Sequence, residues 1–257
     1  MVKRITFKNS RHKTIVCNLY EASSNTIVIM APGSCSDKSS QGRFDIFARS
    51  LNAQGIAALT IDFSGCGESD DDSICVEKEV DDLITAVSAI KSMNYQKIGL
   101  LGNSLGALVC FKAYSPDIKT IVATGGLTGP MQYDWPNYFK PEQMIELKEK
   151  GYISTFDAHN MHRLKVVIDK KLLTEIESIK QQDIYPPIQC PVLFIHGDGD
   201  PEEQALHEHS QSALSFLSST SEIKIIKGAG HGFWGFIGEV DQILTEWFAK
   251  NLQPGSA

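Results

Sequence analysis

The most constraining feature of the sequence is a regular alternation between short apolar runs and longer amphipathic stretches. The short runs are rich in β-branched residues, and several of them end in glycine or aspartate, as buried strands do. The longer stretches space their apolar residues as helices do. The stretch over 77–93 also has acidic residues near its start and a lysine near its end, which suits the helix dipole. This alternation favours an α/β fold, with helices on both faces of a mostly parallel sheet.

The expected elements can be placed along the chain from this pattern. The runs at 4–9 and 14–20 predict an opening hairpin. Further strands are predicted at 26–33, 56–65, 97–104, 118–126, 190–198 and 222–228. Helices are predicted at 44–55, 77–93, 105–115, 205–217 and 238–251.

The alternation stops between residues 127 and 187. This segment is polar, aromatic and helical in its spacing, with one short strand-like run at 164–168. A structureless loop of that length is unusual inside a compact domain. We therefore predict a core built from 1–126 and 188–257, with an inserted helical cap over 127–187. The alternative is that these are ordinary helices of the main domain.

Bulk properties exclude several classes of partner. The 257-residue chain has a formal net charge of -7 and no block of lysine and arginine, so it has no footprint for nucleic acid or anionic lipid. No apolar run reaches the roughly 20 residues that span a bilayer, and the start lacks a secretory apolar core. These features predict a cytoplasmic protein without stable membrane insertion. The six cysteines are scattered and predicted to be reduced thiols, and no metal site is expected.

Ser104 stands between two glycines in the run GNSLG, between a predicted strand and a predicted helix. A serine on so sharp a turn takes a strained backbone conformation, and Gly102 and Gly106 remove the side chains that would collide there. Serine alone is a weak nucleophile, so it needs a base within hydrogen-bond reach and an acid that orients the base. The pattern indicates a nucleophile, although an ordinary strand-to-helix turn can carry the same glycines.

Two later motifs supply candidates for the base and the acid. The run HGDGDP at 196–201 follows a predicted strand, where carboxylates face the crevice of a parallel sheet. The run GAGHGF at 228–233 places His231 between glycines after the next strand. Each motif alone is also typical of a polar turn or a surface histidine. Their order, serine then aspartate then histidine, each after a strand, makes the set informative.

On these motifs the sequence resembles the α/β-hydrolase family, over roughly 26–248. The resemblance rests on APGS, DFSGCGES, GNSLG, HGDGD and GAGHGF. It implies that Ser104 is the nucleophile, His231 the general base and Asp200 the acid. Asp200 is preferred to its competitor Asp198 because the family's aspartate stands four residues after the histidine of the HG turn, here His196. His196 itself is expected to shape the turn and to take no part in catalysis.

The resemblance also implies an oxyanion hole and a structural turn. Backbone N–H groups of Ser34, in APGS, and Leu105, after the nucleophile, are the predicted donors. APGS replaces the family's commoner HG pair, which leaves Gly33 as a second candidate donor. In DFSGCGES, Asp62 is expected to pack and accept hydrogen bonds.

The function implied is hydrolysis of small acyl esters, as by a carboxylesterase of the EC 3.1.1 kind, with no metal or organic cofactor. Within the family the chain is similar to small esterases, including cinnamoyl- and feruloyl-type esterases, and to monoglyceride lipases. Acyl-thioesterase or acylaminoacyl-peptidase activity, and a catalytically silent binding protein on the same fold, remain alternatives. Haloalkane or epoxide chemistry is disfavoured because it needs an aspartate at the sharp strand-to-helix turn, the nucleophile elbow, where this chain carries Ser104.

Aromatic residues of the predicted cap are candidates for an acyl pocket. They are Tyr133, Trp135, Tyr138, Phe139, Tyr152 and Phe156. Among them Trp135, Tyr152 and Phe156 are the predicted substrate-binding residues. The same side chains could equally form a small core of the cap.

Overall fold

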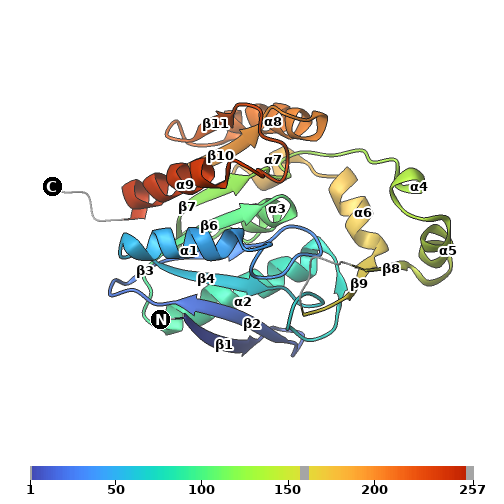
Figure 1. Cartoon of the computed structure of the whole chain (residues 1–257), viewed down its shortest axis with the longest axis horizontal. Coiled ribbons are helices and arrows are strands. Elements are labelled where there is room, and N and C mark those ends of the chain that lie inside the picture. Colours follow the sequence, from blue (N-terminus) through green and yellow to red (C-terminus); the bar gives the residue numbers. More distant parts are fainter. Residues whose placement is uncertain (1, 157–161, 253–257) are drawn as a thin grey trace.

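The computed structural model describes residues 2–156 and 162–252, which build a twisted eight-stranded sheet between layers of helices (Figure 1). The strand order is β1-β2-β4-β3-β6-β7-β10-β11. β1 and β2 pair antiparallel, as do β2 and β4, and the other pairs are parallel. The strands are β1 (Val2–Lys8), β2 (Thr14–Tyr20), β3 (Thr26–Ala31), β4 (Ala57–Asp62), β6 (Lys97–Asn103), β7 (Ile118–Thr124), β10 (Val192–Gly197) and β11 (Glu222–Ile226). Each matches a predicted strand, and the α/β fold is confirmed.

The central strands are apolar on both faces because both faces are covered. In β3, Ile27 and Ile29 point into one core cluster, whereas Val28 and Met30 point into the other. All four side chains are fully buried. Alternate residues of a strand face opposite sides, so a continuous apolar run is what a doubly covered strand requires.

The helices divide between the two faces of the sheet. α1 (Arg43–Ala53) and α9 (Ile237–Leu252) pack together on one face. α2 (Val76–Ser92), α3 (Leu105–Lys112) and α8 (Pro201–Ala213) cover the other, and a short 3₁₀ turn (Leu214–Phe216) follows α8. Turns between strands and helices therefore carry the motifs recognised in the sequence.

The inserted segment, residues 127–187, is helical only in part. It contains α4 (Trp135–Tyr138), α5 (Pro141–Lys150), β8 (Tyr152–Phe156), β9 (Lys165–Asp169), α6 (Lys170–Glu177) and α7 (Gln181–Ile184). Residues 157–161 lie outside the described part. In Figure 1 this segment extends to the right of the main sheet, apart from α7, which lies beside it.

The inserted segment therefore holds the predicted helices and the short strand predicted at 164–168, which is β9, together with a second strand, β8, that was not predicted. β8 and β9 pair antiparallel, and β9 also pairs with β5 (Ser73–Ile74), which belongs to the core part of the chain. The apolar residues of 136–153 are spaced as in a helix, but the helix α5 stops at Lys150. Gly151, in a left-handed conformation, ends it, and the residues that follow form β8. β8 exists through its partner β9, a long-range contact that local spacing does not record. Among the described residues, no helix is long and apolar enough to cross a membrane.

Candidate active site

Ser104 occupies a strained turn between β6 and α3. Its φ of 52° and ψ of -118° lie where residues other than glycine rarely go. A Cβ on Gly102 would lie 2.4 Å from Ala107 Cα, and one on Gly106 would lie 2.2 Å from the Ala31 carbonyl oxygen. The two glycines thus permit the close approach that the motif predicts, and the turn presents the hydroxyl of Ser104 to a cavity.

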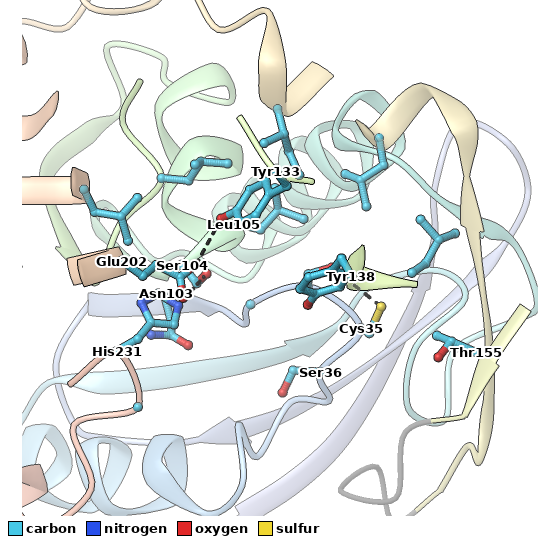
Figure 2. Close-up of a pocket in the computed structure, with 18 of the residues that line it drawn as sticks. Cys35, Ser36, Asn103, Ser104, Leu105, Tyr133, Tyr138, Thr155, Glu202 and His231 are labelled. Atoms are coloured by element: carbon cyan, nitrogen blue, oxygen red, sulfur yellow. Dashed lines mark hydrogen bonds between the residues drawn. The ribbon is translucent and has the colours of Figure 1, made fainter. Parts of the chain in front are cut away.

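His231 meets Ser104 from the loop after β11. Its Nε2 lies 3.1 Å from Ser104 Oγ, across 127 residues of sequence. The structure therefore brings the predicted nucleophile and base together, in hydrogen-bond geometry that suits proton transfer from the hydroxyl to the ring (Figure 2).

The carboxylate on the other ring nitrogen belongs to Glu203, and the position predicted for Asp200 is wrong. Glu203 Oε1 lies 2.6 Å from His231 Nδ1, and the side chain of Glu203 is fully buried. Asp200 instead accepts from the backbone N–H of His231 (2.7 Å) through one oxygen. Through the other it accepts from the backbone N–H of Glu203 (2.8 Å). It is the N-cap residue of α8, so its carboxylate is committed to backbone donors.

Asp198, the other candidate for the acid, also accepts a hydrogen bond from a backbone N–H. Its Oδ1 accepts from the N–H of Gly228 at 2.5 Å, which ties the turn after β10 to the turn after β11. Within residues 2–156 and 162–252, neither aspartate of HGDGDP forms a hydrogen bond with the imidazole ring of His231.

Glu203 is held from its other side by a second histidine. Its Oε2 lies 3.1 Å from His196 Nδ1 and accepts from the backbone N–H of Gly197 at 2.9 Å. His196 Nε2 lies 2.8 Å from Ser210 Oγ, which lies 2.9 Å from Thr128 Oγ1. A Ser210 hydroxyl that donates to Nε2 fixes His196 as the neutral tautomer that donates from Nδ1. His196 thus does more than shape its turn.

These contacts determine the pKa values of Glu203 and His231. Burial alone would raise the pKa of Glu203, but hydrogen bonds from His196, His231 and Gly197 lower it to about 2. Burial alone would lower the pKa of His231, but the bond to Glu203 and the charges of the nearby carboxylates raise it above its ordinary value. A fixed negative charge beside Nδ1 stabilises an imidazolium, which a general base becomes after taking a proton.

Ser104 opens onto a cavity of about 550 Å³ between the core and the inserted segment. The predicted oxyanion donors Ser34 and Leu105 both line it, as does Gly33. Within residues 2–156 and 162–252, the backbone N–H groups of Ser34 and Leu105 make no hydrogen bond with other protein groups. Both donors therefore remain available to an oxygen bound at Ser104.

The cap aromatics form one wall of this cavity. Tyr133, Trp135, Tyr138, Phe139 and Phe156 line it. The first four also contact one another, with ring centroids 4.9 to 6.1 Å apart, so they serve both as lining and as a small core. In Figure 2 the hydroxyl of Tyr133 points toward Ser104 and Glu202, to which it donates a hydrogen bond of 3.0 Å, and Tyr138 lies beside Cys35.

Tyr152 is the exception, and its predicted place in the pocket is wrong. It is not one of the described residues that line the cavity. It begins β8, at the opposite end of the strand from Phe156, and its ring lies 5.8 Å from Lys150 Nζ. Among the described residues, no group of three or more His, Cys, Asp or Glu side chains could hold a metal ion.

The chain belongs to the α/β-hydrolase family, whose model matches residues 28–242. It is 26% identical to an uncharacterized 31.7 kDa Escherichia coli protein from the traX-finO intergenic region, over 80% of this chain and 85% of that one.

Solved structures show the same fold. The α/β hydrolase GrgF from Penicillium sp. sh18 is 19% identical with a TM-score of 0.77, over 98% of this chain and 99% of that one. Est1E from Butyrivibrio proteoclasticus, solved with ferulic acid bound, is 18% identical with a TM-score of 0.76, over 96% and 98%.

Proposed function

We propose that this protein is a serine hydrolase that cleaves carboxylic esters through an acyl-enzyme on Ser104. One observation carries the proposal: Ser104, His231 and Glu203 form a continuous hydrogen-bonded line at the base of a cavity. A nucleophile, a base and an orienting acid in that order define the machinery of acyl transfer.

In the proposed mechanism His231 takes the proton of Ser104, and Oγ attacks the ester carbonyl carbon. The N–H groups of Ser34 and Leu105 stabilise the oxyanion. His231 then gives its proton to the departing alcohol, which leaves the acyl group on Ser104. Water, deprotonated by His231, releases the acid by the same path. Glu203 stays ionised throughout, because its pKa of about 2 lies far below the working range of the imidazole.

The cavity wall supports an apolar or aromatic acyl group. Its cap side consists mainly of aromatic and aliphatic side chains, among them Trp135, Phe139 and Leu172. Apolar pockets select acyl chains by size, at about 1–3 kcal/mol per methylene. Est1E, which shares the fold, has been solved with ferulic acid, so hydroxycinnamate esters belong in the first substrate panel.

The test is a burst experiment with chromogenic esters that vary in acyl length and aromaticity. We expect a burst close to one equivalent of alcohol, and an acyl adduct on the peptide that contains Ser104. Thioester and peptide substrates with matched acyl groups provide the comparison of leaving groups. Hydrolysis without a Ser104 adduct, or no hydrolysis of any ester while thioesters react, would refute the proposal as stated.

A further inference from the structure

Arg43, which is partly buried, differs in its surroundings from Lys38, a buried cation of the preceding loop. Lys38 Nζ lies 2.6 Å from Asp62 and 2.7 Å from Glu68, so its charge is balanced within the protein. Arg43 lines the cavity at Ser104, yet among residues 2–156 and 162–252 it forms no ion pair within 4.0 Å of a carboxylate. It is also the only lysine or arginine among the described residues that line this cavity.

The guanidinium of Arg43 is held by neutral groups. Nε and Nη2 donate to the carbonyl and the hydroxyl of Ser40, both at 3.0 Å. Nη2 also donates to Asn103 Oδ1 at 3.3 Å, and Nη1 donates to the Gly232 carbonyl at 3.2 Å. The second Nη1 hydrogen has no acceptor in the described part of the chain. One N–H and a full positive charge therefore remain for a ligand.

Trp234 fixes the guanidinium from its face. Arg43 Cζ lies 5.3 Å from the centre of the Trp234 ring, which is 58% exposed at the mouth of the cavity. Gly232 makes this packing possible, because a Cβ there would lie 2.4 Å from Trp234 Nε1. An arginine stacked in this way has lost much of its side-chain freedom before any ligand arrives.

The position is unfavourable for an unpaired cation. Arg43 is the first residue of α1, where the helix dipole favours negative charge. Burial lowers the pKa of Arg43, which reflects the loss of water around the charge. The nearest acid in the same helix turn, Asp45, hydrogen-bonds to Tyr20 instead. An anion from outside the chain would compensate this charge.

The location of Arg43 identifies which part of a substrate it meets. Under the proposed function, His231 protonates the leaving alcohol, so the alcohol lies beside the His231 loop. Gly232 follows His231 directly and accepts from Arg43, which places the guanidinium on that side. The aromatic wall of the inserted segment belongs to other elements of the cavity.

We propose that Arg43 binds a carboxylate on the alcohol portion of the substrate, so that the preferred substrates are esters of hydroxy acids with an apolar acyl group. This inference rests on the proposed function for its assignment of sides. The carboxylate accepts from the free Nη1 hydrogen of Arg43, and Trp234 limits the movement of the guanidinium.

The test uses two esters with one acyl group, an O-acyl glycolate and the matching O-acyl glycolamide, which differ in a carboxylate or a carboxamide. We expect the wild type to prefer the glycolate, mainly through KM. Arg43→Gln should reduce that preference by about 10- to 100-fold, the usual range for a charge-assisted hydrogen bond, and Arg43→Lys should retain part of it. Arg49→Gln, a change of the same charge on an exposed face of α1, is the control and should keep the preference.

A purely structural role predicts a different result, because Arg43 also ties Asn103 and Gly232 together. In that case Arg43→Gln slows both esters by the same factor, the ratio is unchanged and the inference is overturned. Calorimetry of the two esters with Ser104→Ala, with and without Arg43→Gln, measures binding apart from catalysis. Equal affinity for glycolate and glycolamide there would overturn the inference even if the ester activity stands, whereas a glycolate preference without hydrolysis in the wild type would refute the proposed function alone.

Discussion

Two turns of this molecule have the same plan and differ in how they position a side chain. At the first, β6 ends, Ser104 follows, and α3 begins. At the second, β10 ends, the turn reaches Asp200, and α8 begins. The first turn is defined by contacts of its own glycines with neighbouring backbone. At the second, two carboxylates three residues apart both reach the His231 loop, and tertiary contacts decide their roles.

The difference shows what a motif can specify. Steric exclusion at Gly102 and Gly106 leaves one conformation for the elbow, so the local sequence suffices. At the α8 turn, Asp200 accepts from the N–H of the third helical residue, which is the ordinary N-cap arrangement. This leaves the third helical residue itself, Glu203, to reach His231, and His196 stabilises it there.

The largest effect is expected from replacing Ser104 at the turn between β6 and α3. Ser104→Ala should lower kcat by about 10⁶-fold, the scale seen when a triad nucleophile is removed. Ser104→Gly should do the same and also raise the free energy of unfolding by about 1 kcal/mol, because glycine tolerates a positive φ. Ester kinetics and thermal melts measure both. An active Ser104→Ala enzyme, or adduct formation on another residue of the cavity such as Cys35, would show that Ser104 is not the nucleophile.

The second largest effect is expected from replacing Glu203, which follows the turn between β10 and α8. Glu203→Gln should lower kcat by about 10⁴-fold, because the imidazole loses its orienting acceptor. His231 must be neutral to act as a base, so activity rises as pH increases through its pKa. Since Glu203 raises that pKa, the acid limb of kcat/KM in Glu203→Gln should move to lower pH. An unchanged pH profile would mean that Glu203 does not act on His231.

A smaller effect concerns the support of Glu203. His196→Phe removes the donor to Oε2 and should lower kcat by about 10- to 100-fold, as loss of supporting partners does at other sites. His196→Asn, whose amide can donate from a similar position, should recover much of the rate. The acid limb should again move to lower pH if Glu203 is displaced. Equal loss in both variants, in proportion to melting temperature, would assign His196 to packing alone.

The smallest effect is expected from the inserted segment, whose side chains are proposed to contact the acyl group. Phe156→Ala should change relative kcat/KM across an acyl series by about 10-fold, through contact with the acyl group. Tyr152→Ala, in the same strand but outside the cavity lining, is the matched control and should keep the order of substrates. Phe156 is 77% exposed, so little loss of stability should accompany its effect. If both variants rank the esters as the wild type does, other lining residues set specificity.

The sequence predicted the sheet, its helices and the meeting of Ser104 with His231, because strand patterns and the glycine-flanked turns are local. The acid was missed although a local signal exists. Asp200 followed by Pro201 and, at the third helical position, Glu203 is an N-cap pattern, which indicates that Asp200 is used by the helix. The partnership of Glu203 with His196 depends on the packing of α8 against β10. The strand β8 also depends on a contact that the local sequence does not record, its pairing with β9.

The most direct test of the account compares the rates at which a fluorophosphonate labels Ser104 in Glu203→Gln and Asp200→Asn. Labelling reports activation of the serine without assuming an ester substrate. The structure predicts that Glu203→Gln labels about 10³- to 10⁴-fold more slowly than the wild type, because His231 loses its acceptor. Asp200→Asn, which keeps an acceptor oxygen for the backbone, should label within about tenfold of the wild type and lose about 1 kcal/mol of stability. The reverse order of rates would contradict the assignment of Glu203 and restore Asp200 as the acid.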